Sequence, residues 1–158
     1  MKHLFWLRPN LIAGRPGPNL NPWDPRELAT GGIGAVLSVN DASSVYIDDL
    51  HRAGLDYAVF PLSDNAPPRP EDFAHCLEML PRAYDYIVGV IEQGRVPLIH
   101  CTAGKDRTGL VMCHYLCRRE GYEPREAVNE VRRVRPIALS ASGYEEFSIE
   151  VLSTLQAG

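Results

Sequence analysis

The sequence predicts an α/β fold, a single-domain sandwich in which helices flank a mainly parallel central sheet. Short apolar runs alternate along the chain with longer stretches of helical periodicity, an order typical of parallel sheets covered by helices. The 158 residues are enough for one hydrophobic core and too few for two. No repeat, low-complexity tract or linker divides the sequence, so we expect one domain over residues 1–158.

Short apolar runs mark the candidate strands. The first two should pair around a turn at residues 8–10, and the others have the uninterrupted apolar character of strands buried on both faces. In chain order the runs are Leu4–Leu7, Leu11–Ala13, Ala35–Val39, Tyr57–Phe60 and Val96–His100. Proline-rich segments at residues 15–18, 21–25 and 66–70 are expected to form ordered loops.

The longer helices are marked by apolar spacing and by signals at their ends. A stripe with spacings of three and four runs from Phe73 to Ile91, and Pro81 inside it should kink or split that helix. Residues 108–120 are apolar nearly all round, which predicts a central buried helix that ends at Gly121.

Two further helices complete the predicted chain. Pro124 has the position of a first helical residue, and Pro136 ends the same apolar pattern. Ser142 and Glu145 have the spacing of a capping box, which predicts the start of a last helix.

Charge and hydropathy exclude several classes of function. Sixteen Lys and Arg against twenty Asp and Glu give a net charge of −4, which disfavours a general nucleic-acid binder or an electrostatic membrane binder. The apolar run at residues 4–7 is too short for a signal peptide, and no stretch approaches the roughly 20 apolar residues that span a bilayer. We therefore expect a cytoplasmic monomer with no nucleic-acid partner and no stable membrane association.

The cysteines predict neither a disulfide framework nor a zinc site. Cys76, Cys101, Cys113 and Cys117 are too few for a disulfide-built fold. Cys113 and Cys117 lie four residues apart without a matching second pair of ligands, so packing in the core is the favoured interpretation. We expect no metal and no cofactor.

The residues between 96 and 109, VPLIHCTAGKDRTG, carry the strongest chemical signal. An apolar strand leads through a short loop directly into the buried helix. Such a loop can turn successive backbone N–H groups toward one centre, which together with the helix dipole makes a site for a phosphate-sized anion. Gly104 permits a turn that a Cβ would obstruct, and Arg107 adds a planar fork that binds two phosphate oxygens.

Cys101 lies at the base of this loop, six residues before Arg107. The positive potential of the loop favours its thiolate, which could attack phosphorus in line. His100 is expected to orient the loop and tune the thiol rather than act as a base. The Thr108 hydroxyl could donate a hydrogen bond to the sulfur and help it leave in a second step.

The decapeptide His100–Gly109 resembles the signature His-Cys-x-x-Gly-x-x-Arg-Ser/Thr-Gly of the cysteine-dependent protein tyrosine phosphatase superfamily. The length of the chain, its start at residues 6–15 and residues 131–136 resemble the small atypical dual-specificity phosphatases. The resemblance implies a cysteinyl-phosphate intermediate and no metal. It assigns phosphate binding to the loop residues Thr102, Ala103, Gly104, Lys105, Asp106 and Arg107, and catalysis to Cys101, Arg107, Thr108 and His100 together with a general acid.

In this superfamily the general acid is an Asp on a loop upstream of the cysteine. Asp64 lies 37 residues before Cys101, after a predicted strand and before a long helix, as that loop does. A lone Asp in a proline-rich loop can also serve only to form a turn. Asp56, near a strand start, and Asp72, in the first turn of a helix, are weaker candidates.

These features predict a hydrolase that dephosphorylates phosphotyrosine, and phosphoserine or phosphothreonine, in proteins or peptides. Lys105 and Asp106 also resemble the loop of phosphoinositide phosphatases, so a phosphoinositide or inositol phosphate is the alternative substrate. Lipid phosphatases of the tensin-related type have a second lysine where this chain has Thr102. A catalytically silent phosphate-binding module is the lesser alternative.

Two secondary roles remain open at this stage. Ser140 or Ser142 could help to position water, although capping is the favoured role of Ser142. Cys76, Cys113 or Cys117 could act as a resolving thiol after oxidation of Cys101.

Overall fold

A computed structural model describes residues 2–158. Its sheet has the strand order β1-β2-β5-β3-β4. The first pair, β1 and β2, is antiparallel, and every other pair of neighbours is parallel. The strands are β1 (Phe5–Arg8), β2 (Ile12–Pro16), β3 (Ala35–Ser38), β4 (Asp56–Val59) and β5 (Pro97–Cys101).

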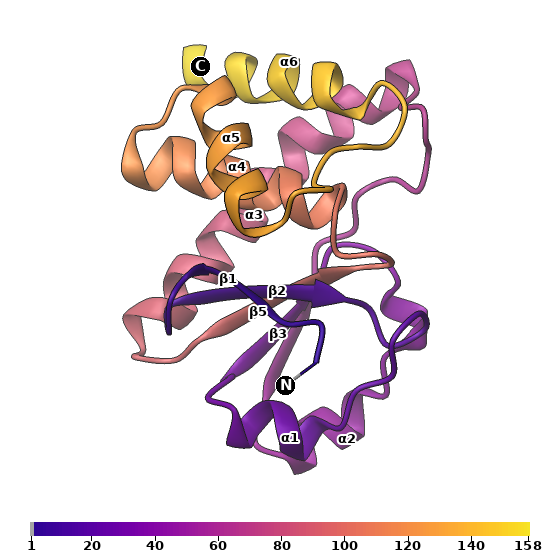
Figure 1. Cartoon of the computed structure of the whole chain (residues 1–158), viewed down its shortest axis with the longest axis vertical. Helices are drawn as coiled ribbons and strands as arrows, with labels where there is room; N and C mark the ends of the chain where they lie inside the picture. The colour runs from indigo at the N-terminus through magenta and orange to yellow at the C-terminus, as the bar shows by residue number, and fades with distance from the viewer. Residues whose placement is uncertain (1) are drawn as a thin grey trace.

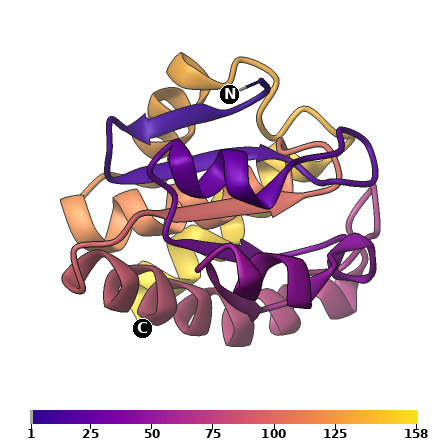
Figure 2. The ribbon, with the colours of Figure 1, turned by 90° about the horizontal axis from the view of Figure 1, so that it is seen from below.

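Helices cover both faces of this sheet. The long helices α3 to α6 lie above it in Figure 1, and the short helices α1 and α2 lie across its other face, as Figure 2 shows from below. The helical elements are α1 (Pro25–Thr30), η1 (Ala42–Ser44), α2 (Ile47–Arg52), α3 (Pro70–Glu92), α4 (Arg107–Glu120), α5 (Pro124–Val134) and α6 (Tyr144–Ala157). The predicted α/β sandwich with a mainly parallel sheet is therefore confirmed.

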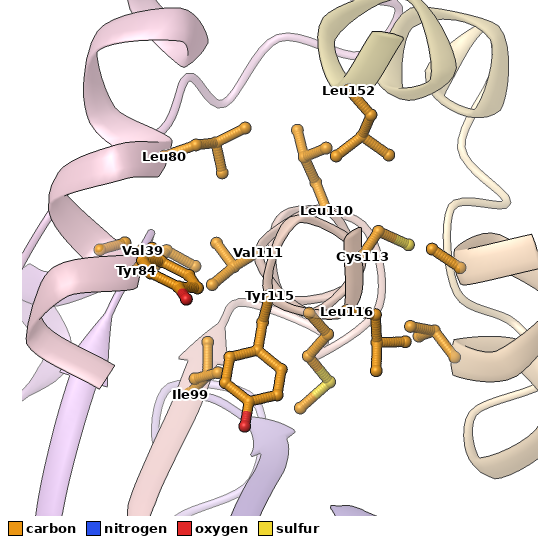
Figure 3. Close-up of a cluster of buried hydrophobic side chains, with 14 of the residues drawn as sticks. Val39, Leu80, Tyr84, Ile99, Leu110, Val111, Cys113, Tyr115, Leu116 and Leu152 are labelled. Atoms are coloured by element: carbon orange, nitrogen blue, oxygen red, sulfur yellow. The ribbon is translucent and has the colours of Figure 1, made fainter. Parts of the chain in front are cut away.

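Two hydrophobic clusters, one on each side of the sheet, hold these layers together. Ile99 belongs to the cluster under α3 to α6, and its neighbour Leu98 belongs to the cluster under α1 and α2. Both side chains are fully buried, which explains why the sequence of β5 is apolar without alternation. Figure 3 looks down α4 and shows side chains of α3, α6 and β5 around it, among them Leu80 and Leu152.

The parallel strands bring the functional segments to one edge. Pro16 at the end of β2 lies beside Cys101 at the end of β5, and Ser38 at the end of β3 lies beside His100. Because parallel strands end on the same side of a sheet, the loops that follow β2, β3 and β5 meet around Cys101. None of the helices in the described part of the chain has both the length and the hydropathy to cross a membrane.

Of the kink or split expected at Pro81, the split does not occur: α3 is a single helix from residue 70 to residue 92. A proline in a helix removes one backbone hydrogen bond, and burial of neighbouring side chains compensates for this loss. Leu80 and Tyr84, on either side of Pro81, both belong to the core cluster that includes α4.

The expected capping box of Ser142 and Glu145 is wrong. Gly143, with a left-handed φ of 72°, is the N-cap of α6, and no side chain caps the helix. Glu145 instead forms an ion pair with Arg132 of α5. This pairing with another helix takes up the carboxylate that the capping box would need.

The sequence patterns also missed the two short helices. The helix α1 begins at Pro25, inside a segment expected to be a loop, where Asp24 accepts a hydrogen bond of 2.9 Å from Arg26 N. Each of the two helices has six residues and buries one leucine, Leu28 or Leu50. That is too short for an apolar stripe to be recognised.

Candidate active site

The backbone of residues 101–107, here called the Cys101 loop, is held from outside through its carbonyl oxygens. Cys101 O lies 3.1 Å from Nδ1 of His100, and Thr102 O accepts a hydrogen bond of 3.1 Å from Gly17 N. Lys105 O accepts one of 3.2 Å from Leu139 N, in the segment after α5. The carbonyls of the loop are therefore turned away from its centre.

Arg135, just after α5, satisfies two further carbonyls of this turn. Its Nη2 donates to Ala103 O over 2.7 Å and its Nε donates to Gly104 O over 3.1 Å. The guanidinium also lies over the ring of Phe5, 5.5 Å from the ring centre. The sequence resemblance covered Arg135 without giving it a role, because a contact with a backbone carbonyl leaves no mark in a side-chain motif.

The amides of the Cys101 loop have the opposite orientation. None of the N–H groups of residues 102–106 donates a backbone hydrogen bond to another residue that the structure describes. Because their carbonyls are bonded outward, these N–H groups face the concave side of the loop, where α4 begins. Converging amides at the N-terminus of a 14-residue helix form a site for a phosphate-sized anion.

The position of Gly104 in the loop has no room for a side chain. Its φ is +64°, and a Cβ placed there would lie 2.6 Å from Arg15 C and from Pro16 N. Both are backbone atoms of β2 and cannot move as a flexible side chain could. The turn that directs the amides inward therefore requires glycine.

The thiol of Cys101 lies beneath this site at the end of β5. The residue is 2% exposed, and its Sγ accepts a hydrogen bond of 3.1 Å from Thr108 Oγ1 in the first turn of α4. Thr108 is itself fully buried. A hydrogen bond to sulfur stabilises the thiolate relative to the thiol.

His100 is fully buried behind the Cys101 loop. Desolvation lowers the pKa of its imidazole to about 4, so the ring is neutral at physiological pH. Besides the contact with Cys101 O, its Nε2 lies 2.5 Å from Ser38 Oγ at the end of β3. His100 thus contacts the backbone of Cys101 and has no contact with its sulfur among the hydrogen bonds of the described residues.

Arg107 connects the Cys101 loop to the segment that carries Asp64. Its Nε donates to Ser63 O over 2.7 Å and its Nη2 donates to Asn65 O over 3.0 Å. Its guanidinium also lies 5.1 Å from the ring centre of Tyr144. Residues 60–66, here called the Asp64 segment, therefore rest against the Cys101 loop.

Asp64 reaches the same site through a residue that the sequence did not point to. Asn40, after β3, donates from Nδ2 to Asp64 Oδ1, and Asn40 Oδ1 accepts a hydrogen bond of 3.3 Å from Thr102 Oγ1. Asp64, Thr102, Arg107 and Asn40 line one open cleft of about 520 Å³. The exposed residue Asp64 thus lines the same cleft as Thr102 and Arg107.

The weaker acid candidates have other partners. Asp72 accepts a hydrogen bond of 2.8 Å from Arg69 N at the start of α3. Although burial raises the pKa of this carboxyl, its hydrogen bonds from Arg69 N and Asn65 hold it below the ordinary value. Asp56 forms an ion pair with Arg95. Neither residue lines the cleft.

Lys105 and Asp106 are directed toward the segment that follows α5. Lys105 Nζ lies 2.8 Å from Asp106 Oδ2 and 3.1 Å from Ser140 Oγ. Asp106 Oδ1 accepts a hydrogen bond of 3.1 Å from Ala141 N, and Asp106 is only 5% exposed. These contacts fix the end of the Cys101 loop to residues 138–141.

The remaining cysteines are buried and have no disulfide partner in the described chain. Desolvation raises the pKa of Cys76 to about 12 and that of Cys117 to about 11, and it raises the pKa of Cys113 as well. They therefore remain thiols at neutral pH, in agreement with packing in the core. A role as resolving thiol stays a prediction.

Comparison with known families and proteins finds relatives for most of the chain. Residues 23–147 match the family model described as dual specificity phosphatase, catalytic domain. The chain is 27% identical to a phosphatidylglycerophosphate phosphatase, PTPMT1, of Arabidopsis thaliana. The match covers 84% of this chain and 40% of that relative. It is 25% identical to a tyrosine-protein phosphatase of Autographa californica nuclear polyhedrosis virus, with 87% of this chain and 80% of that one covered.

Solved structures share the whole fold. A mutant form of Tk-PTP is 26% identical, with a TM-score of 0.75 over 97% of this chain and 94% of that one. PTPMT1 in complex with PI(5)P is 15% identical, with a TM-score of 0.75 over 99% of this chain and 98% of that one. The second likeness shows the fold alone.

Proposed function

Because the chain belongs to the dual specificity phosphatase family, we propose that it is a cysteine-dependent phosphomonoester hydrolase acting on phosphotyrosine, and on phosphoserine or phosphothreonine, in proteins. The observation that carries the proposal is the orientation of the Cys101 loop. Its carbonyls are bonded outward, its amides face one centre, and the Cys101 thiol lies at the base of that centre.

In the first step the Cys101 thiolate attacks phosphorus and forms an S–P bond as the ester P–O bond breaks. Asp64 transfers its proton to the departing oxygen, because an alkoxide or phenoxide leaves poorly without one. The loop amides and Arg107 bind the three phosphoryl oxygens and stabilise the charge that develops on them. The products of this step are the free alcohol and a cysteinyl-phosphate.

In the second step water attacks the cysteinyl-phosphate. The Asp64 carboxylate takes a proton from the water as the new P–O bond forms and the S–P bond breaks. The sulfur leaves as a thiolate that accepts the hydrogen bond from Thr108 Oγ1. Inorganic phosphate departs, and Asp64 is again protonated for the next cycle.

A phospholipid headgroup is the second candidate substrate. The likeness to a phosphatidylglycerophosphate phosphatase favours it. The contacts of Lys105 favour proteins instead, since its ammonium is bonded to Asp106 and Ser140. A second phosphate on the substrate would have to compete with both partners for this lysine.

The test is an assay of the purified chain, with a chelator present, on 4-nitrophenyl phosphate, phosphotyrosine and phosphoserine peptides, and vesicles containing a phosphoinositide or phosphatidylglycerophosphate. We expect turnover of the aryl phosphate and the phosphotyrosine peptide that is lost in Cys101→Ser. A folded chain that binds vanadate but hydrolyses none of these substrates would replace the proposal with a phosphate-binding module. Preference for the vesicles would replace the protein substrate with a lipid.

A further inference from the structure

A second pocket, here called the Arg15 pocket, lies on the other side of the sheet from the Cys101 side chain. It has a volume of about 360 Å³ and lies between the start of the chain, the end of β2 and residues 21–28 around the start of α1. Figure 1 shows the start of the chain coming down toward α1. Leu28 in its wall belongs to the hydrophobic cluster under α1 and α2, whereas Cys101 belongs to the cluster under α3 to α6. The Arg15 pocket is therefore separate from the cleft lined by Asp64 and Arg107.

Arg15 brings a buried positive charge to this pocket. The residue is only 3% exposed, and its Nη1 donates to Pro16 O over 3.1 Å and to Asn21 O over 3.0 Å. Its Nε is buried without a hydrogen-bond partner, and its Nη2 forms neither a hydrogen bond nor an ion pair with the residues that the structure describes. Nε and Nη2 make up the edge of a guanidinium that binds both oxygens of one carboxylate. Because a buried N–H without a partner is costly, this edge favours an acceptor in the pocket.

Glu27, in the first turn of α1, lines the same pocket with the opposite charge. Burial lowers the pKa of the Arg15 guanidinium, and the charge of Glu27 acts against this change. The two side chains are close enough to interact in this way, yet no ion pair joins them in the described structure. Asp24 is already engaged, since it caps α1 and lies 3.7 Å from Arg26 Nε. The carboxylate of Glu27 is thus available to a cation in the pocket.

The formal charges around the Arg15 pocket select among small ligands. Arg15 and Lys2 contribute two positive charges, and Asp24 and Glu27 contribute two negative charges. A phosphate dianion bound to Arg15 would be repelled by both carboxylates. A ligand with one carboxylate and one ammonium group has no net charge and finds a partner for each group. Charge complementarity therefore favours a zwitterion.

The other walls of the pocket are apolar. The ring of Trp23 lies 5.3 Å from Cζ of Arg15, so it supports the guanidinium by a cation–π contact. Pro22 and the buried Leu28 line the pocket beside it. The volume is at the lower end of the roughly 300–1,000 Å³ typical of sites for small molecules. These walls favour a small ligand with an apolar side chain.

We propose that the Arg15 pocket binds a free amino acid with an apolar side chain, whose carboxylate pairs with Arg15 and whose ammonium group pairs with Glu27. This site is distinct from the one that binds the phosphoryl group of the substrate. Its occupation can be measured without turnover, so the proposal does not depend on the phosphatase function.

Three probes of similar shape test the two charges separately. They are L-leucine, 4-methylpentanoate, which lacks the ammonium group, and 3-methylbutylamine, which lacks the carboxylate. Each is titrated into the full chain labelled with nitrogen-15, and inorganic phosphate is titrated in parallel. We expect leucine to shift the indole signal of Trp23 and the amide signals of residues 21–28, and to leave those of residues 102–106 unchanged. The amine should bind at least about tenfold more weakly than leucine, because it lacks the group that Arg15 binds.

Two variants assign the partners, each with a matched control. Glu27→Gln should weaken leucine binding about threefold to fivefold and leave 4-methylpentanoate unaffected, because only leucine carries the ammonium group. Glu146→Gln, at another exposed glutamate in the first turn of a helix, should change neither affinity. Arg15→Lys should weaken both ligands about tenfold or more, since lysine keeps the charge but lacks the planar fork. Arg95→Lys, at an arginine that binds backbone carbonyls outside this pocket, is its control, and urea unfolding verifies that all four variants are folded.

Several results would overturn the inference. One is the absence of any leucine-dependent shift at Trp23 up to the solubility of leucine. Another is a set of shifts confined to residues 102–106, which would place leucine at the Cys101 loop. Equal affinity for leucine and 4-methylpentanoate would remove the role of Glu27 and reduce the site to one for simple carboxylates. Binding of phosphate in place of leucine would contradict the charge argument.

Discussion

The guanidinium of Arg135 lies 2.7 Å from Ala103 O and 3.1 Å from Gly104 O, so the end of α5 holds the backbone of the Cys101 loop. Arg135 and Ala103 are 32 positions apart in the sequence. The contact explains how the turn at residues 103–104 keeps its amides directed inward. A side chain that holds the loop in place therefore comes from a segment outside the decapeptide His100–Gly109.

Arg135→Ala should therefore impair anion binding more than it impairs folding. Two hydrogen bonds from a charged donor are lost, each worth about 1.5–3 kcal/mol where buried, and the loop relaxes to recover part of this energy. We expect kcat/KM for 4-nitrophenyl phosphate to fall at least about tenfold and vanadate binding to weaken in parallel. Arg133→Ala, an exposed arginine of α5 that pairs with Glu130, is the control and should be near neutral. Equal activity in the two variants would contradict the role of Arg135.

Asn40→Ala should affect the reaction through Asp64. Without the Asn40 amide, the Asp64 carboxylate loses its link to Thr102 and should sample more conformations. We expect kcat to fall about tenfold for phenyl phosphate, whose leaving group needs a proton, and less for 4-nitrophenyl phosphate. In an Asp64→Ala background the same substitution should have no further effect. An undiminished effect of Asn40→Ala in that background would show that Asn40 does not act through Asp64.

Gly104→Ala should destabilise the chain and abolish turnover. The new Cβ adds a collision with the backbone of β2 to the strain of a left-handed conformation, which alone costs about 1 kcal/mol or more. Gly94→Ala is the matched control, because Gly94 has a φ of +74° but no atom within 4 Å of the position of its Cβ. Urea unfolding should show the larger loss of stability in Gly104→Ala. Equal losses in the two variants would rule out the collision.

Stability should decrease in mild acid because His114 is buried in α4. Desolvation lowers its pKa in the folded chain to about 4, against 6.5 for the free side chain. Between these values the unfolded chain binds a proton that the folded chain does not, so the free energy of unfolding falls as the pH drops below about 6.5. At pH 5.5 His114 alone should cost about 1 kcal/mol relative to pH 7.5.

His114→Phe keeps an aromatic ring against Tyr84, which packs edge-on with His114 at 5.7 Å, and removes the titrating group. The difference in urea midpoint between pH 7.5 and pH 5.5 should therefore be smaller in this variant than in the unsubstituted chain. Identical pH dependence in the two chains would show that His114 does not contribute.

The sequence predicted the features that local pattern determines. The uninterrupted apolar character of β5, the buried helix α4 ending at Gly121 and the decapeptide between them were all recognisable, because each is set by residues close together in the chain. Asp64 was predicted as the general acid from a family resemblance, by its distance from Cys101 and its place between a predicted strand and a long helix, and this role stays a prediction.

The contacts between remote segments were not predictable in this way. Asn40 contacts Asp64 through its side-chain amide, and Arg135 contacts backbone carbonyls of the Cys101 loop. Neither kind of contact follows a fixed spacing of residues in the sequence. The capping box of Ser142 failed for the same reason, since a remote arginine, Arg132, takes up the Glu145 carboxylate.

The most direct test of the account is mass spectrometry of the chain quenched during turnover of 4-nitrophenyl phosphate. We would use Asp64→Ala, in which the loss of the general base slows hydrolysis of the intermediate, with Cys101→Ser as the control. The account predicts a mass increase of one phosphoryl group, located on Cys101 by peptide mapping and absent from the control. Turnover with no phosphorylated cysteine, or turnover that persists in Cys101→Ser, would contradict it.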